Sequence, residues 1–384
     1  MKNKTFLDKI VDLGKKQIGI FPEKKPPKTV EKEEVINENE LSPEEKIVRK
    51  LNIKVTDKVT DSQKKYIEQK QKAVMLFFLE RVKEISKPCN TKDNHNKVVD
   101  VINERIKDLT FNISNEEDYK KGYYEGKPDY MKNNLFIPAG YYSIKENTVY
   151  MRVEPYLREG FSKGELPKIA LSTLVHETIH GVSTNQKDKV GLMTVYESSR
   201  GKEKIIGRGL NEAATIDITE KIIGKSRVNG YSEDYKEVLN TIRSIAEINE
   251  KEYLNTYFIK NKWYTKELEK RFNPAENNRG DLKKIITNYD NRNISSKFDK
   301  NTVVKGLYEG FSNNYIIKSD VKKEKYKEHF LKNMTNIVDY FETEDVNLET
   351  EKYIKKAQDR RKEKEKENKE KNIINKSREE DLIR

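Results

Sequence analysis

The pentad His176-Glu177-Thr178-Ile179-His180 carries residue types at a spacing that suits metal-dependent hydrolysis. Two histidines four residues apart lie on the same face of an α-helix and can bind one cation. Zinc accepts imidazole ligands, and a carboxylate beside the first imidazole can act as the base for a zinc-bound water. The pattern therefore predicts that His176 and His180 bind zinc and that Glu177 is the catalytic base. The alternative is a pair of ordinary histidines on a buried helix.

A helix has to position this pentad. Pro167 suits the first turn of such a helix, and Gly181 suits its end. The apolar body of the predicted helix consists of Ile169, Ala170, Leu171, Leu174, Val175 and Ile179. Two runs rich in β-branched and aromatic residues flank the polar turn Lys145-Glu146-Asn147, and they predict a hairpin over 141–153, directly before the helix.

A catalytic zinc needs a third protein ligand and an open position for water. Glu212 is the candidate, within Gly209-Leu210-Asn211-Glu212-Ala213-Ala214-Thr215. We predict a helix over 210–223 that carries it, preceded by a short strand over 190–197 and a polar turn over 198–204. The two remaining histidines, His95 and His329, stand in charged surroundings and are expected at the surface. Glu212 is thus the candidate third ligand beside His176 and His180, and the family resemblance described next implies this set.

The pentad followed by Asn211-Glu212-Ala213-Ala214 resembles the gluzincin branch of zinc metallopeptidases. In that family the third ligand is a glutamate on a second helix, often preceded by asparagine. The resemblance covers about residues 135–225. It implies zinc-dependent hydrolysis of peptide bonds with Glu177 as the general base. The family's order of elements, a sheet, the active-site helix, a linking segment, the glutamate helix and a helical lobe, also fits the predicted ones.

One position departs from the thermolysin-like members of that family. They have an aspartate four residues after the ligand glutamate, where it orients a histidine, and Ile216 occupies that position here. Thr215 lies on the same helix face as Glu212, so we predict that Thr215 makes this outer hydrogen bond. The family also suggests a downstream donor that stabilises the oxyanion. Tyr231 is our candidate for this catalytic role, and Tyr235 is the alternative.

The predicted fold class is α+β. We expect a zincin-like catalytic core with a small mixed or antiparallel sheet and an active-site helix, a mostly helical C-terminal lobe and charged tails. Peptidases of this type bind substrate as an added strand at a sheet edge, which the 141–153 hairpin could supply. Helical periodicity predicts helices over 62–87, 96–108, 231–248, 250–259, 262–271, 302–317 and 322–344, whereas the signals over 272–300 are weak.

Three parts are predicted along the chain. They are an N-terminal amphipathic segment with a disordered linker (1–45), a zincin-like catalytic domain (46–348) and a charged low-complexity tail (349–384). Within the catalytic domain we expect a helical N-terminal part (46–110), the catalytic core (120–225) and a helical lobe (226–348). Within the linker, Ser42 before Pro43 predicts the start of a helix.

The composition limits the compartment and the partners. Of the 384 residues 37% are charged and 34% hydrophobic, and the net charge is +12. Lysines alternate with glutamates, which favours a solvated surface over a nucleic-acid interface. The lone Cys89 excludes an intramolecular disulfide, and no apolar run approaches the ~20 residues of a membrane span. Residues 1–21 lack the apolar core of a signal peptide. We therefore expect a cytoplasmic protein, with leaderless export left open. The expected substrates, which the family resemblance implies, are peptides or proteins.

Two other functions remain open at this point. One is a basic scaffold associated with nucleic acid or a membrane, in which the metal site is structural or vestigial. Residues 4–19 form an amphipathic pattern that could make a peripheral membrane contact. The other is a zinc protein that hydrolyses a non-peptide amide. The cleavage specificity and the oligomeric state do not follow from the sequence.

Overall fold

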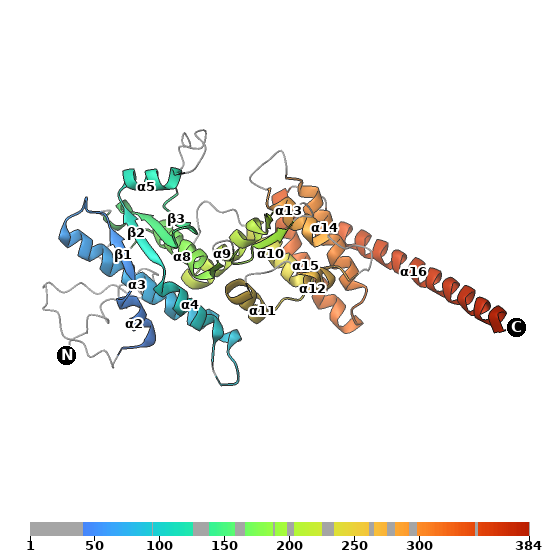
Figure 1. Ribbon diagram of the computed structural model, residues 1–384. Helices are drawn as coiled ribbons and strands as arrows, with labels where there is room; N and C mark the ends of the chain where they lie inside the picture. The colour runs from blue at the N-terminus through green and yellow to red at the C-terminus, as the bar shows by residue number, and fades with distance from the viewer. Residues whose placement is uncertain are drawn as a thin grey trace. The chain divides into compact units, whose positions relative to one another are not determined.

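The structure is a computed structural model (Figure 1), and it describes residues 41–93, 95–125, 138–157, 166–186, 189–197, 203–224, 234–260, 265–274, 281–291, 298–341 and 345–383. Contacts divide the chain into two units. Unit 1 comprises residues 1–203, 211–231 and 250–262, and unit 2 comprises residues 204–210, 232–249 and 263–384. None of the described helices is long and apolar enough to cross a membrane.

Unit 1 contains a mixed four-stranded sheet with the strand order β1-β2-β4-β3. Its strands are β1 (Asn52–Val55), β2 (Thr110–Ser114), β3 (Gly140–Ser143) and β4 (Thr148–Arg152). The pairs β1–β2 and β2–β4 are parallel, whereas β3 and β4 form an antiparallel hairpin at one edge. The predicted hairpin is therefore confirmed, and so is the α+β class.

The two faces of the hairpin carry different side chains. Tyr141 and Tyr150 are opposite each other in the register, and their rings stack with centroids 4.8 Å apart. Helix α5 (Glu116–Tyr124) covers this face and brings Tyr119 against Tyr141. The opposite face, which includes Tyr142 and Gly140, packs against helix α8 (Lys168–Ser183). Helix α8 thus lies directly beside the edge strand β3.

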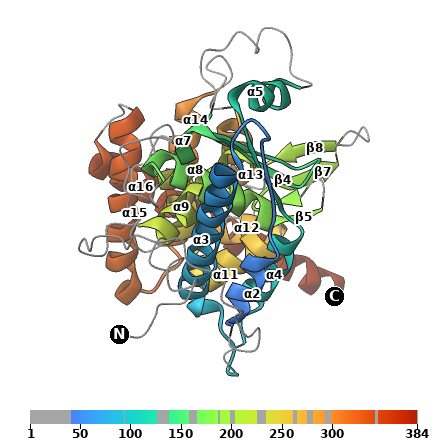
Figure 2. The same ribbon diagram turned by 90° about the vertical axis from the view of Figure 1, so that its left-hand side faces the viewer.

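Helices from the N-terminal and C-terminal parts of the unit 1 sequence pack around α8. Helix α3 (Asp61–Ile85), which begins with a capping box between Thr60 and Gln63, lies next to α8 (Figure 2). The buried Met75 of α3 contacts Thr178 of α8. Arg81 of α3 donates to the carbonyl oxygens of Lys221 and Ile222. These carbonyls lie in the last turn of α9 (Arg208–Ile223), so the cation satisfies acceptors that a helix end leaves free. The other elements are α2 (Pro43–Arg49), η2 (Lys87–Cys89), α4 (Lys97–Lys107), α7 (Glu154–Leu157), β5 (Thr184–Gln186), β6 (Lys189–Val190), β7 (Thr194–Glu197), α11 (Glu250–Asn255) and the π-helical turn η3 (Thr256–Lys260).

Unit 2 is helical apart from part of strand β8 (Glu203–Ile206). Its core contains a column of aromatic rings in which Phe311 stacks on Phe330 with centroids 3.8 Å apart and on Tyr326 at 5.1 Å. The helices are α10 (Asp234–Ile245), α12 (Lys266–Phe272), α13 (Asp281–Tyr289), α14 (Lys300–Tyr315), α15 (Asp320–Phe341) and α16 (Val346–Ile383).

Several expected boundaries differ from the observed ones. Helix α8 continues past Gly181 to Ser183, because the glycine there allows close packing rather than a stop. The predicted strand over 190–197 is split into β6 and β7. The weak signals over 272–300 conceal helix α13, and most of the predicted charged tail lies in helix α16. The predicted helix start at Ser42 is confirmed, whereas residues 4–19 and most of the linker lie outside the described residues.

Candidate metal centre

Helix α8 positions both histidines and Glu177 in the interior of unit 1. His176 is 1% exposed, and the other two side chains are also buried. Gly181 explains how the helix approaches the sheet so closely. A Cβ atom at this position would lie 2.8 Å from Leu109 Cδ1 and 3.4 Å from a ring atom of Tyr142. The absence of a side chain at Gly181 therefore allows α8 to hold the pentad close to the sheet.

Helix α9 brings Glu212 to the same point. Its Oε2 atom lies 3.3 Å from His176 Nε2, and its Oε1 atom lies 3.4 Å from His180 Nε2. The two Nε2 atoms are 3.1 Å apart. Among the described residues, these three side chains form the one group of potential metal ligands whose donor atoms converge. The three ligands predicted from the sequence thus come together in the fold.

These distances suit a tetrahedral zinc ion. Zinc binds imidazole nitrogen and carboxylate oxygen at about 2.0–2.2 Å, which separates neighbouring ligand atoms by about 3.3–3.5 Å. The observed separations are close to that range: 3.1 Å between the two Nε2 atoms, and 3.3 and 3.4 Å from these atoms to the two different carboxylate oxygens of Glu212. The Glu212 side chain remains 39% exposed, so one side of the cluster is open to solvent. The donor set therefore fits a zinc ion with one position left for water.

The charges of the cluster support a bound cation. Burial alone would raise the pKa of Glu212, but the two imidazoles outweigh it and hold the pKa well below its usual range. Burial would lower the pKa of His180, yet the Glu212 carboxylate raises it overall. The lone pairs of the two Nε2 atoms, which are 3.1 Å apart, would repel each other unless a proton or a cation lies between them. The site is built to hold positive charge.

Glu177 is placed beside the cluster by both a helix and a strand. Burial raises the pKa of its carboxyl group, while the charges of His176 and His180 and a hydrogen bond from the Tyr142 backbone N–H oppose the rise. The N–H group belongs to the edge strand β3. Ala139 accepts a hydrogen bond from Arg152, so the alternation of an antiparallel pair directs the backbone of residues 140 and 142 away from β4. Glu177 thus contacts the outer edge of the sheet.

A layer of polar side chains lies behind His180. Thr215 Oγ1 is 3.5 Å from His180 Nδ1, which is the contact predicted from the sequence. Asn211 Nδ2 is also 3.5 Å away but is a donor, and Asn211 Oδ1 already accepts from Leu192 N–H at 2.8 Å. Of the two side chains, Thr215 is therefore the one that can accept a proton carried on Nδ1. That tautomer would leave the Nε2 lone pair of His180 directed at the cluster.

Tyr257 completes this layer, and the sequence analysis missed it. The Thr215 hydroxyl donates to the Asn211 carbonyl at 2.8 Å, so the Tyr257 hydroxyl is the donor in its 2.6 Å bond to Thr215. Tyr257 lies in the π-helical turn η3, and its pKa is raised by burial. A single tyrosine among 21 gives no distinguishing sequence signal. The predicted oxyanion donor Tyr231 lies outside the described residues, as does the side chain of Tyr235.

Comparison with known proteins adds no further assignment. No protein-family model matches the chain, and no curated protein or solved structure matches it either.

Proposed function

We propose that this protein is a zinc-dependent peptidase with a zincin-like core of gluzincin type. The observation that supports the proposal most directly is the convergence of His176, His180 and Glu212 at zinc-compatible separations beside the buried Glu177. A zinc ion held by these three ligands would supply a Lewis acid that activates water and polarises the substrate carbonyl.

The residues of the chain then have distinct roles. Glu177 would accept the proton of the attacking water on its carboxylate and deliver it to the leaving amine. Its raised pKa favours the first of these transfers, because the group is a stronger base than an exposed carboxylate. The Tyr142 N–H group would hold the carboxylate toward the sheet edge. Thr215 would keep the proton of His180 on Nδ1.

The edge strand β3 supports a peptide as the substrate. The outward N–H and C=O of Gly140 and the outward C=O of Tyr142 can pair with an extended chain, while the Tyr142 N–H contacts Glu177 at the same edge. Strand addition uses every second backbone N–H of the ligand. In a cleaved peptide, N-methylation scanned along the sequence should therefore raise KM at alternate positions. Equal effects at consecutive positions would exclude strand addition.

Three variants separate zinc binding from catalysis. Purified protein should contain one zinc ion per chain by mass spectrometry, and His176→Ala or Glu212→Ala should lose it. Glu177→Gln should retain the zinc but reduce cleavage of a peptide library by roughly 10²–10⁴-fold, the usual contribution of a general base. Cleavage at the wild-type rate by Glu177→Gln would rule out the proposed mechanism. Zinc retained by both ligand variants would rule out the metal site itself.

A further inference from the structure

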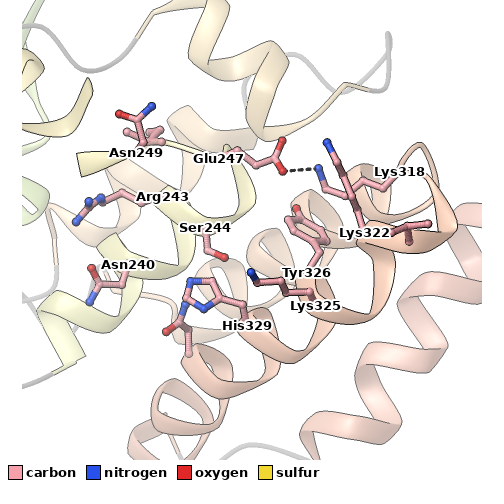
Figure 3. A pocket seen from close by; sticks show the side chains of 13 residues that line it. Asn240, Arg243, Ser244, Glu247, Asn249, Lys318, Lys322, Lys325, Tyr326 and His329 are labelled. Carbon is pink, nitrogen blue, oxygen red and sulfur yellow. Dashed lines mark ion pairs between the residues drawn. The ribbon is translucent and has the colours of Figure 1, made fainter. Parts of the chain in front are cut away.

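Unit 2 has a groove of its own between α10 and α15, with a volume of about 910 Å³ (Figure 3). That volume lies within the range of small-molecule sites. Lys325 and His329 project from α15 toward α10, and Ser244 faces them from α10. All the residues that line the groove belong to unit 2, so this feature is independent of the metal centre.

The groove carries an excess of positive charge. Four of its lining side chains are cations, and Glu247 is the one carboxylate among the lining residues. Glu247 is already paired with Lys318 at 3.0 Å. Lys318 is largely buried and also lies over the ring of Tyr326, 4.4 Å from its centroid. Lys322 and Lys325 therefore line a space whose one acidic lining group is neutralised.

The lysines of helix α15 that lie outside the groove lining differ from those that line it. Lys323 pairs with Asp320 at 2.7 Å, and Lys327 pairs with Glu351. Neither Lys322 nor Lys325 has a carboxylate within ion-pair distance in the described part of the chain. On one helix, two lysines outside the groove lining are thus neutralised, whereas two lysines that line the groove are not.

Uncharged donors line the same groove. Asn240 and Ser244 come from α10, and Asn333 comes from α15. The Nδ2 atom of Asn333 is buried and has no hydrogen-bond acceptor among the described residues. A buried amide donor without a partner costs free energy that a bound acceptor would recover. The groove therefore combines charged lysine side chains with uncharged hydrogen-bond donors, and phosphate oxygens can accept hydrogen bonds from both.

We infer that this groove binds a soluble small molecule that bears several phosphate groups. Lys322 and His329 are seven residues apart on α15, which corresponds to about 10 Å along the helix. One phosphate cannot bridge that length, whereas a chain of linked phosphates can. The limited volume of the groove favours a small molecule over a DNA duplex or a membrane surface, which require a broad basic face.

Inorganic triphosphate is the probe, and isothermal titration calorimetry on the full chain is the measurement. The double variant Lys322→Gln/Lys325→Gln should weaken binding by roughly 100-fold, because each charge-assisted contact contributes about tenfold. The matched control Lys323→Gln/Lys327→Gln removes the same charge from the same helix and should bind triphosphate like the wild type. ATP should compete with triphosphate, and orthophosphate should bind much more weakly.

Three results would overturn the inference. The first is no binding of triphosphate by the wild-type chain. The second is an equal loss of affinity in the two double variants, since that would reflect net charge alone. The third is a groove-dependent affinity for a short DNA duplex, or for phosphatidylserine vesicles over phosphatidylcholine ones, with no affinity for triphosphate.

Discussion

Replacement of Thr215 by valine tests the polar layer behind His180 without touching a proposed zinc ligand. Thr215 is fully buried, and valine has nearly the same shape. The substitution removes the acceptor that lies 3.5 Å from His180 Nδ1 and the acceptor of the 2.6 Å bond from Tyr257. His180 would then be free to carry its proton on Nε2, where the proton competes with a metal.

The expected loss is larger for zinc affinity than for folding. Hydrogen-bond partners of metal-binding histidines contribute about 10–100-fold to metal affinity, and the long 3.5 Å contact indicates a loss of roughly tenfold, or about 1.4 kcal/mol. The Tyr257 hydroxyl loses its acceptor, but Ser183 also contacts it, so the free energy of unfolding should fall by only about 1 kcal/mol. Competition with a fluorescent zinc chelator measures the affinity, and urea unfolding measures the stability.

Thr219→Val is the matched control. Thr219 is also fully buried one turn further along α9, and its hydroxyl donates to the Thr215 carbonyl at 2.7 Å. This variant should lose comparable stability but keep the wild-type zinc affinity. The double variant Thr215→Val/Tyr257→Phe should be more stable than the sum of its single changes predicts, because the phenol without an acceptor is removed. Wild-type zinc affinity in Thr215→Val would refute the proposed role of Thr215.

Three further predictions concern metal, packing and the core of unit 2. Zinc at about 100 times its Kd should add about 2.7 kcal/mol to the stability of unit 1, so EDTA should lower its melting temperature in calorimetry by several degrees. Gly181→Ala should lower the free energy of unfolding by about 1–3 kcal/mol in urea titrations, because the added methyl overlaps Leu109. Phe311→Ala removes the ring stacked on Phe330 and should cost about 3–5 kcal/mol in the same assay. An unchanged melting temperature after EDTA, or an unchanged urea midpoint in either variant, would contradict the corresponding prediction.

Most parts of the site that were predicted from the sequence are governed by short spacing rules, whereas Glu212, 36 residues after His176, was predicted with the help of the family resemblance. Two histidines four residues apart must share a helix face, and Thr215 must share a face with Glu212. The hairpin was predictable because its polar turn separates two β-prone runs. In each case the relevant residues lie within about two helical turns or one hairpin, so the local geometry fixes their relative positions.

The parts that were missed depend on contacts between distant segments. Strands β1 and β2 have only four and five residues, and they pair in parallel across 58 positions at Asn52 and Thr110. Parallel pairing leaves no turn signal in the sequence. Helix α13 is the exception, because Leu282, Ile285, Ile286 and Tyr289 have helical spacing and their pattern was present in the sequence. Tyr257 reaches Thr215 from 42 residues away.

The backbone contact to Glu177 illustrates a further limit. Any residue type except proline offers a backbone N–H, so the identity of Tyr142 does not predict that its N–H meets a carboxylate. The contact follows from the register of β3 against β4 and from the close approach of α8, which depends on Gly181. A shift of one residue in that register would exchange the groups that face β4 with those that face outward. The register of the hairpin is therefore as important for the position of the Glu177 carboxylate as the helix that carries it.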